Sequence, residues 1–195
     1  MLEYRLYYAQ EGLMLSKPVS QSQSGFTLIE LVVVIIVLGI LAVIAMPKFI
    51  NVSEDAQVAT VKGTAGAFKS GLDLSRAVWA VKVGNGPVED LPVFGNSQAG
   101  EVDFNANGWP AQHYIHGNEA SPKLDNVEDC ISVWQVIFQG DEPSVSDTAN
   151  SNETHYKATY SAAATCTFSY RKNSNLSIQY DSNLGKVTVD SDPSS

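Results

Sequence analysis

An uninterrupted apolar run near the N-terminus limits the structures open to this chain. Residues 31–46 read LVVVIIVLGILAVIAM and contain no charged side chain. Residues 26–29 extend the run to about 21 residues, which at roughly 1.5 Å per residue of helix reaches about 30 Å, the thickness of a bilayer's hydrocarbon core. We therefore expect a single membrane-spanning helix that starts close to Phe26.

One carboxylate, Glu30, interrupts this run near its start. A charge costs on the order of 2.5–3.5 kcal/mol at the centre of a membrane helix and less near an end. Two interpretations stay open at this point. Either Glu30 lies in the headgroup layer at the edge of a plain anchor, or its carboxylate has a partner and a function.

The start of the run carries a resemblance to a known family. Residues 25–30 (GFTLIE), followed by the apolar span, resemble the type III signal sequence of type IV prepilins and of the related pseudopilins. The resemblance is close from Gly25 to Asp55 and covers the rest of the chain only in general layout. Residues 47–49 (PKF) and 107–110 (NGWP) look most like the mannose-sensitive haemagglutinin (MSHA) type of pilin.

This resemblance implies how the N-terminus is processed. Residues 1–25 would be a leader, cut on the cytoplasmic side between Gly25 and Phe26 by a prepilin peptidase that also methylates the new amine of Phe26. Met14 offers a second start, with which residues 1–13 are not translated. Residues 26–47 then stay with the mature chain as its transmembrane and filament-core segment. The residues implicated in assembly are Phe26, Glu30, Gly39 and Pro47.

Apolar residues continue beyond Pro47 at spacings of three, four or seven. They are Val58, Val61, Ala65, Phe68, Leu72, Trp79 and Val83. This stripe predicts an amphipathic half, residues 48–83, of one long helix over about 28–83. Pro47 is expected to kink the helix, because it removes one backbone hydrogen bond. Residues 84–87 (GNGP) are expected to end it.

The remainder, residues 84–195, is expected to form the globular part outside the membrane. Residues 84–129 have turn composition and predict an irregular connection with a short helix near 123–130. Beyond it, period-two alternation predicts strands at 131–138, 156–160, 165–170, 176–180 and 186–189. Residues 139–154 are expected to be a loop, and residues 181–185 a hairpin turn. The predicted fold class is α+β, the type IV pilin fold, with the amphipathic helix half on an antiparallel sheet of four or five strands.

Two cysteines, Cys130 and Cys166, lie far from the anchor. An even count in an exported domain predicts one disulfide, which we place at the outer edge of the sheet. Two buried thiols in a cytosolic protein are the alternative. A bridge closing a loop of this size stabilises the fold by about 4 kcal/mol in the chain-entropy model.

Charge excludes one class of function. The formal net charge is −9, and the charges of residues 1–25 cancel, so the acidic excess belongs to residues 26–195. Binding to nucleic-acid phosphates needs Lys and Arg, so we expect no nucleic-acid partner.

Two patterns suggest a metal site and fail on inspection. Residues 103–108 (DFNANG) match the first half of an EF-hand loop, but its twelfth position, which should be an acid, is Tyr114. A structural turn is the better interpretation. His113 and His116 lack further ligands nearby. We find no catalytic motif, and we expect no metal, no cofactor and no enzymatic activity.

The resemblance implies a structural role. The expected function is that of a filament subunit for attachment and biofilm formation, anchored in the inner membrane of a Gram-negative bacterium and then assembled into a surface pilus. Its expected partners are identical subunits, the prepilin peptidase, the inner-membrane assembly machinery and a host or abiotic surface. The alternatives are a major pseudopilin of a type II secretion system, or an anchored periplasmic enzyme or binding domain.

Overall fold

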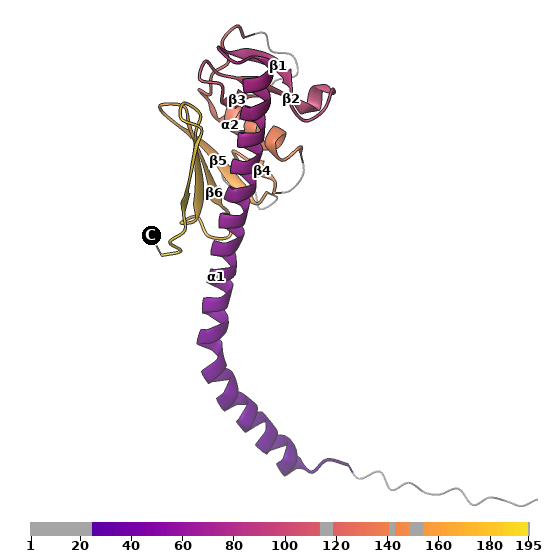
Figure 1. The fold of residues 1–195 in the computed structure, drawn as a ribbon. Coiled ribbons are helices and arrows are strands. Elements are labelled where there is room, and N and C mark those ends of the chain that lie inside the picture. Colours follow the sequence, from indigo (N-terminus) through magenta and orange to yellow (C-terminus); the bar gives the residue numbers. More distant parts are fainter. Residues whose placement is uncertain (1–24, 114–118, 141–142, 149–153, 195) are drawn as a thin grey trace, which may run out of the picture. The chain divides into compact units, whose positions relative to one another are not determined.

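The computed structural model describes residues 25–113, 119–140, 143–148 and 154–194 (Figure 1). The chain divides into two compact units, Met1–Met46 and Pro47–Ser195. Three features from the sequence analysis lie outside the described residues: the leader up to residue 24, Tyr114 and His116.

One helix, α1 (Leu28–Lys82), begins in the first unit and ends in the second, close to the predicted bounds of 28–83. Its first part, Leu28–Met46, has a mean hydropathy of 3.2, and the structure buries none of it. By length and composition this part can cross a membrane, as expected. The helix continues through Pro47. A kink at Pro47 would change how the two units are oriented relative to each other, and the predicted kink stays a prediction.

The second part of α1 carries the expected apolar stripe. Its buried apolar residues are Val61, Ala65, Phe68, Leu72 and Trp79. The helix ends as its composition indicated, because the N–H groups of Val83 and Gly84 both donate to the carbonyl of Trp79, over 2.8 and 3.0 Å. Gly84 has a φ of 79°, a left-handed conformation that suits glycine at a helix end.

A five-stranded sheet forms most of the C-terminal half. Its order is β4-β5-β6-β7-β8, with β4 parallel to β5 and all other neighbours antiparallel. The strands are β4 (Val145–Ser146), β5 (Tyr156–Ser161), β6 (Thr165–Tyr170), β7 (Ser177–Asp181) and β8 (Lys186–Asp190). The last four confirm the predicted strands within one residue at each end. Strand β4 lies where a loop was expected.

A second sheet of three strands was not predicted. It has the order β1-β2-β3 and consists of β1 (Val88–Pro92), β2 (Glu101–Phe104) and β3 (Pro110–Gln112), with a 3₁₀ turn, η1 (Gln98–Gly100), between β1 and β2. The prediction of an irregular connection over residues 84–129 was therefore wrong. These strands have three to five residues and a register shift in each pairing, so alternation is too short to detect.

The predicted strand at 131–138 was also wrong, because this segment is the helix α2 (Val127–Ile137). A capping box starts α2. The side chain of Asn126 accepts a bond from the N–H of Asp129 over 2.9 Å, and Oδ2 of Asp129 accepts one from the N–H of Asn126 over 3.2 Å. Neighbours cover α2 on most sides, so its apolar residues follow no single period.

The core joins both helices to the five-stranded sheet, as Figure 1 shows for α1 beside β5 and β6. The ring of Phe68 on α1 lies 5.2 Å from that of Trp134 on α2 and 5.7 Å from that of Phe168 on β6, between centroids. Its distance to the ring of Tyr180 on β7 is also 5.7 Å. The amphipathic half of α1 therefore packs on the sheet as predicted, and α2 is the additional partner.

A candidate processing and assembly site

Thr27 and Glu30 form a capping box at the start of α1. The N–H and the hydroxyl of Thr27 both donate to Oε2 of Glu30, each over 2.8 Å. In return the N–H of Glu30 donates to Oγ1 of Thr27 over 3.3 Å. These bonds satisfy backbone N–H groups that a helix start leaves without partners. The sequence analysis missed this role, although T-x-x-E is the pattern of a capping box.

The carboxylate of Glu30 lies among apolar side chains. A shallow depression on the first helical turns is lined by Phe26, Ile29, Glu30, Val33 and Val34. Phe26 and Ile29 are 93% and 71% exposed. Among the residues that the structure describes, none donates a hydrogen bond to the other carboxylate oxygen, Oε1. The arrangement offers a negatively charged acceptor on an otherwise apolar, accessible surface.

The predicted cleavage point is accessible within the first unit. Gly25 and Phe26 precede the helix in irregular structure, and both are exposed. A Cβ added to Gly25 or to Gly39 would meet no atom within 4 Å. Cleavage between Gly25 and Phe26, and a role of Gly39 and Pro47 in assembly, remain predictions.

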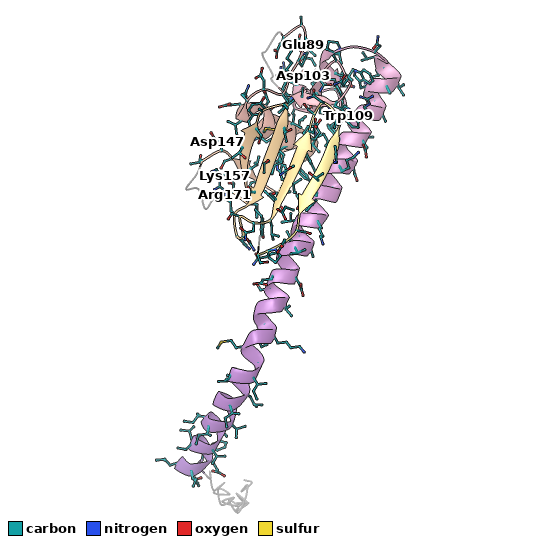
Figure 2. All side chains as sticks on the ribbon, turned by 90° about the vertical axis from the view of Figure 1, so that its left-hand side faces the viewer. Glu89, Asp103, Trp109, Asp147, Lys157 and Arg171 are labelled. Carbon is teal, nitrogen blue, oxygen red and sulfur yellow. A yellow bond between two sulfur atoms is a disulfide. The ribbon has the colours of Figure 1, made fainter. Side chains whose placement is uncertain are left out.

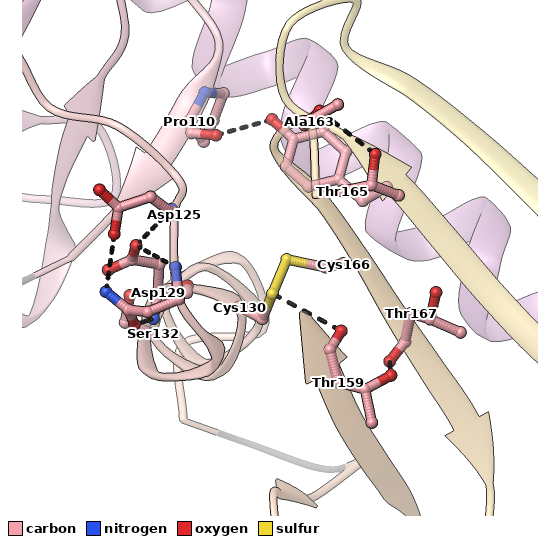
Figure 3. The surroundings of a disulfide bond; sticks show 12 residues. Pro110, Asp125, Asp129, Cys130, Ser132, Thr159, Ala163, Thr165, Cys166 and Thr167 are labelled. Carbon is pink, nitrogen blue, oxygen red and sulfur yellow. Dashed lines mark hydrogen bonds between the residues drawn. A yellow bond between two sulfur atoms is a disulfide. The ribbon is translucent and has the colours of Figure 1, made fainter. Parts of the chain in front are cut away.

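The disulfide between Cys130 and Cys166 is confirmed (Figure 3). Its Cα atoms lie 5.6 Å apart, and both residues are fully buried. The predicted location was wrong, because Cys166 lies on β6, the middle strand of the five, and Cys130 lies on α2. The bridge therefore fastens α2 to the centre of the sheet and not to its outer edge.

The segment 103–108, considered above as a calcium loop, forms a structural turn. Oδ1 of Asn105 accepts bonds from the N–H groups of Asn107 and Trp109, over 2.9 and 3.1 Å. Oδ1 of Asp103 accepts the N–H of Asp90 over 2.8 Å. In the part of the chain described here, no group of three or more His, Cys, Asp or Glu residues could hold a metal.

A stack of aromatic and cationic groups fixes this turn against α1. The guanidinium of Arg76 lies 4.8 Å from the ring centre of Trp79 and 4.7 Å from that of Trp109, and Arg76 Nη1 donates to the carbonyl of Asn107. Trp109 lies beside α1 (Figure 2). Lys69 Nζ lies 5.4 Å from the ring centre of Trp109. Gly185 at the β7–β8 turn is a further neighbour, where an added Cβ would overlap the indole. The stack joins three segments distant in sequence, so no local pattern indicated it.

Comparisons with known proteins agree with the resemblance at the N-terminus. Residues 20–46 match the family described as the prokaryotic N-terminal methylation motif. The chain is 41% identical over 78 residues to the type IV narrow pilus major component PilA5 of Thermus thermophilus, which covers 40% of this chain and 63% of that protein. No solved structure matches the chain significantly.

Two further relatives match over the helix region. The type II secretion system core protein G of Pseudomonas aeruginosa is 43% identical over 54 residues, 28% of this chain and 38% of that protein. The type IV major alpha-pilin of Moraxella bovis is 44% identical over 52 residues, 27% of this chain and 33% of that protein. The chain thus spans less than two thirds of the length of each of these relatives.

The class of protein follows from these observations together. An apolar N-terminal helix, antiparallel sheets, the methylation motif and pilin relatives support the type IV pilin superfamily, in which pilins and pseudopilins share the N-terminal segment. These observations do not identify which type of pilin or pseudopilin the chain is. None of the three relatives named above is described as a pilin of the MSHA type, and that assignment stays a proposal.

Proposed function

We propose that this chain is the structural subunit of a type IV pilus of the MSHA-like type. In this proposal the precursor is held in the inner membrane of a Gram-negative bacterium by α1. A prepilin peptidase removes residues 1–25 and methylates Phe26. The inner-membrane assembly machinery then adds the mature subunit to the base of a surface filament. The protein is a substrate and a building block, and it catalyses no reaction.

One observation supports this proposal above the others. None of the segment Leu28–Met46 is buried within the chain, and it carries a single carboxylate near its start. A bilayer can cover the apolar side chains, but it disfavours the charge of Glu30, and the helix cap with Thr27 needs only an acceptor oxygen, which an uncharged residue could also provide. Contact with identical segments in a filament covers the same apolar surface and can also provide a cation for Glu30.

That cation would be the amine of a neighbouring subunit. After cleavage Phe26 becomes the first residue, and its methylated amine keeps a positive charge. Pairing of this amine with the Glu30 carboxylate of the next subunit sets the axial register between the two. Because residue 26 of one copy meets residue 30 of another, the contact is heterologous and does not close on itself, which produces an open helical polymer.

The second unit supplies the surface of such a filament. The disulfide and the aromatic core hold this unit rigid. Its exposed loops would contact host or abiotic surfaces in attachment and biofilm formation. The alternative is a major pseudopilin, in which the same N-terminal segment serves protein secretion. The match to a type II secretion core protein favours this alternative, whereas the Thermus and Moraxella relatives are pilus components.

Electron microscopy separates the two functions. Filaments are sheared from cells that carry the gene, from a deletion strain and from a complemented strain, and are labelled with antibody against residues 154–194. The pilus proposal expects labelled filaments in the first and third strains only. Equal numbers of unlabelled filaments in all three, with the protein confined to the membrane, would favour the pseudopilin.

A further inference from the structure

The chain contains the dipeptide Asn-Gly twice, at Asn85-Gly86 and at Asn107-Gly108. Asparagine loses its side-chain amide most readily in this dipeptide, because the backbone nitrogen of the next residue attacks its Cγ, and glycine has no Cβ to hinder that approach. The two pairs are equivalent as local sequence. The structure places them in different environments, so their reactivities should differ.

This loss of the amide, deamidation, needs only water. The glycine nitrogen gives its proton to a base from the solvent and forms a bond to Cγ of the asparagine. The bond from Cγ to Nδ2 breaks, and Nδ2 leaves as ammonia, which gives a cyclic imide. Water then opens the ring at one of its two carbonyls. The product is aspartate, or isoaspartate, in which the main chain runs through Cβ.

Hydrogen bonds and crowding oppose this reaction at Asn107. The attacking nitrogen is engaged, because the N–H of Gly108 donates to the carbonyl of Asn105 over 2.9 Å. The leaving group is engaged as well, since Nδ2 of Asn107 donates to the carbonyl of Asn183 over 3.2 Å. Gly108 is also buried, and an added Cβ there would come within 2.5 Å of the ring of Trp79. Attack at Asn107 therefore requires two bonds to break in a crowded site.

The first pair has none of these restraints. Asn85 is exposed. In the part of the chain that the structure describes, neither its side chain nor the N–H of Gly86 takes part in a hydrogen bond. A Cβ added to Gly86 would meet no atom within 4 Å. The carbonyl of Gly86 accepts a bond from Nε1 of Trp79 over 3.1 Å, which holds the segment without engaging the attacking nitrogen.

We propose that Asn85 is a deamidation site of the folded protein and that the fold protects Asn107. The inference is independent of the proposed function, because it rests on contacts within the second unit and not on assembly. It assigns a covalent modification to the segment that ends α1, with water as the only co-reactant.

Deamidation of Asn85 changes the end of α1 in two ways. A carboxylate replaces a neutral amide next to the C-terminal end of the helix, where the helix dipole disfavours negative charge. In isoaspartate the main chain is also one carbon longer, which displaces the carbonyl of Gly86 from Nε1 of Trp79. Trp79 is only 6% exposed, so this would leave a donor of a buried side chain without its partner. The modified protein should therefore be less stable than the unmodified one.

Peptide mapping compares the two sites in a single sample. The full-length protein, in detergent and with its disulfide intact, is incubated at mildly alkaline pH and digested with a protease that cuts after glutamate. Cuts after Glu89 and Glu101 place Asn85 and Asn107 on different peptides. Mass spectrometry then follows the conversion of amide to acid in each peptide. We expect the reaction at Asn85 to be at least about ten-fold faster than at Asn107, a difference of about 1.4 kcal/mol in activation free energy.

Two controls identify the cause of the difference. In the same protein, reduced and unfolded in guanidinium chloride, the two sites should react at similar rates, because only the local sequence then acts. Asn85→Gln should remove the mass change from the first peptide and leave the rate at Asn107 unchanged, since the longer side chain closes the ring far more slowly. Equal rates in the folded protein, or a faster rate at Asn107, would overturn the inference. An Asn85 that reacts only after unfolding would overturn it too.

Discussion

Thr27 donates both its backbone N–H and its hydroxyl to the same oxygen of Glu30, each over 2.8 Å. The carboxylate therefore caps the start of α1 within its own chain. This role is independent of the proposed pairing with an amine of another subunit. These two roles need different chemistry. A helix cap needs only an acceptor oxygen, which glutamine also provides, whereas pairing with an amine needs the negative charge.

The first prediction separates these roles at Glu30. Glu30→Gln keeps the capping box and removes the charge, and Glu30→Val removes both. We expect both variants to insert in the membrane at least as well as the wild type, because the charge is lost. Both should nearly abolish filaments, since an amine left unpaired in a buried interface costs about 3–5 kcal/mol. Immunoblots of membrane and sheared fractions measure the two pools.

Thr27→Ala is the matched control for this test. It removes the hydroxyl of the cap and keeps the carboxylate, at a cost of about 1 kcal/mol in helix stability. We expect it to form filaments in reduced but clearly detectable amounts. If Glu30→Gln made wild-type amounts of filament while Thr27→Ala made none, the cap would be the essential role and the pairing with Phe26 would be wrong.

A second prediction concerns the disulfide. Replacing Cys130 and Cys166 together by alanine releases a cross-link across 36 positions of sequence. The free energy of unfolding should fall by about 4 kcal/mol in the chain-entropy model. Urea titration of the full-length protein in detergent measures this. A variant as stable as the wild type would show that the core alone holds α2 against β6.

A third prediction is a loss of stability at alkaline pH. Tyr180 is completely buried, and its hydroxyl donates to the carbonyl of Pro110 over 2.7 Å. Burial raises the pKa of Tyr180 well above 10, the nearby charge of Asp181 raises it further, and Arg76 lowers it. The unfolded state therefore loses its proton first. The contribution of Tyr180 to stability is complete below about pH 10 and falls as the pH rises from there towards the folded pKa.

Tyr180→Phe tests this dependence. The variant should be about 1 kcal/mol less stable at neutral pH, because Pro110 loses its hydrogen bond. Its stability should then decline less steeply than that of the wild type above pH 10. Burial raises the pKa of Tyr156 as well, so part of the decline remains. Parallel curves for the two proteins would contradict the assignment to Tyr180.

A fourth prediction compares two glycines in opposite environments, Gly108 in a crowded turn and Gly63 at an open helical position. Gly108 has a φ of 72°, and an added Cβ would come within 2.5 Å of the ring of Trp79. Gly108→Ala should therefore lower the free energy of unfolding by about 1–3 kcal/mol. Gly63→Ala should raise it by up to about 1 kcal/mol, since position 63 is an open helical site. Thermal unfolding of both variants in detergent gives the comparison, and equal effects would contradict it.

Some of this structure was open to prediction because its signals are local. The apolar run and the stripe from Val61 to Trp79 define α1 nearly to the residue. The alternation of apolar and polar residues predicts strands β5 to β8, because each of them has one face on the core. The cysteines could be paired because there are only two in a domain expected to be exported.

Other parts could not be predicted, or were misjudged, for physical reasons. Helix α2 is buried on most sides, so its alternating sequence suggested a strand. The pattern N-x-x-D at Asn126 and Asp129 was the available signal for a helix start. The contact of Arg76 with Trp109 depends on the tertiary fold, and no periodicity contains it. At the candidate site, T-x-x-E was visible in the sequence, and only its capping geometry needed the structure.

Mass spectrometry of sheared surface filaments tests the proposed function most directly. The account predicts that the N-terminal peptide recovered from filaments of wild-type cells begins at Phe26 and carries a methyl group on its amine. It also predicts that peptides from residues 154–194 are abundant in the same fraction. A chain found only in the membrane fraction, or one in filaments that begins at another residue or lacks the methyl group, would contradict it.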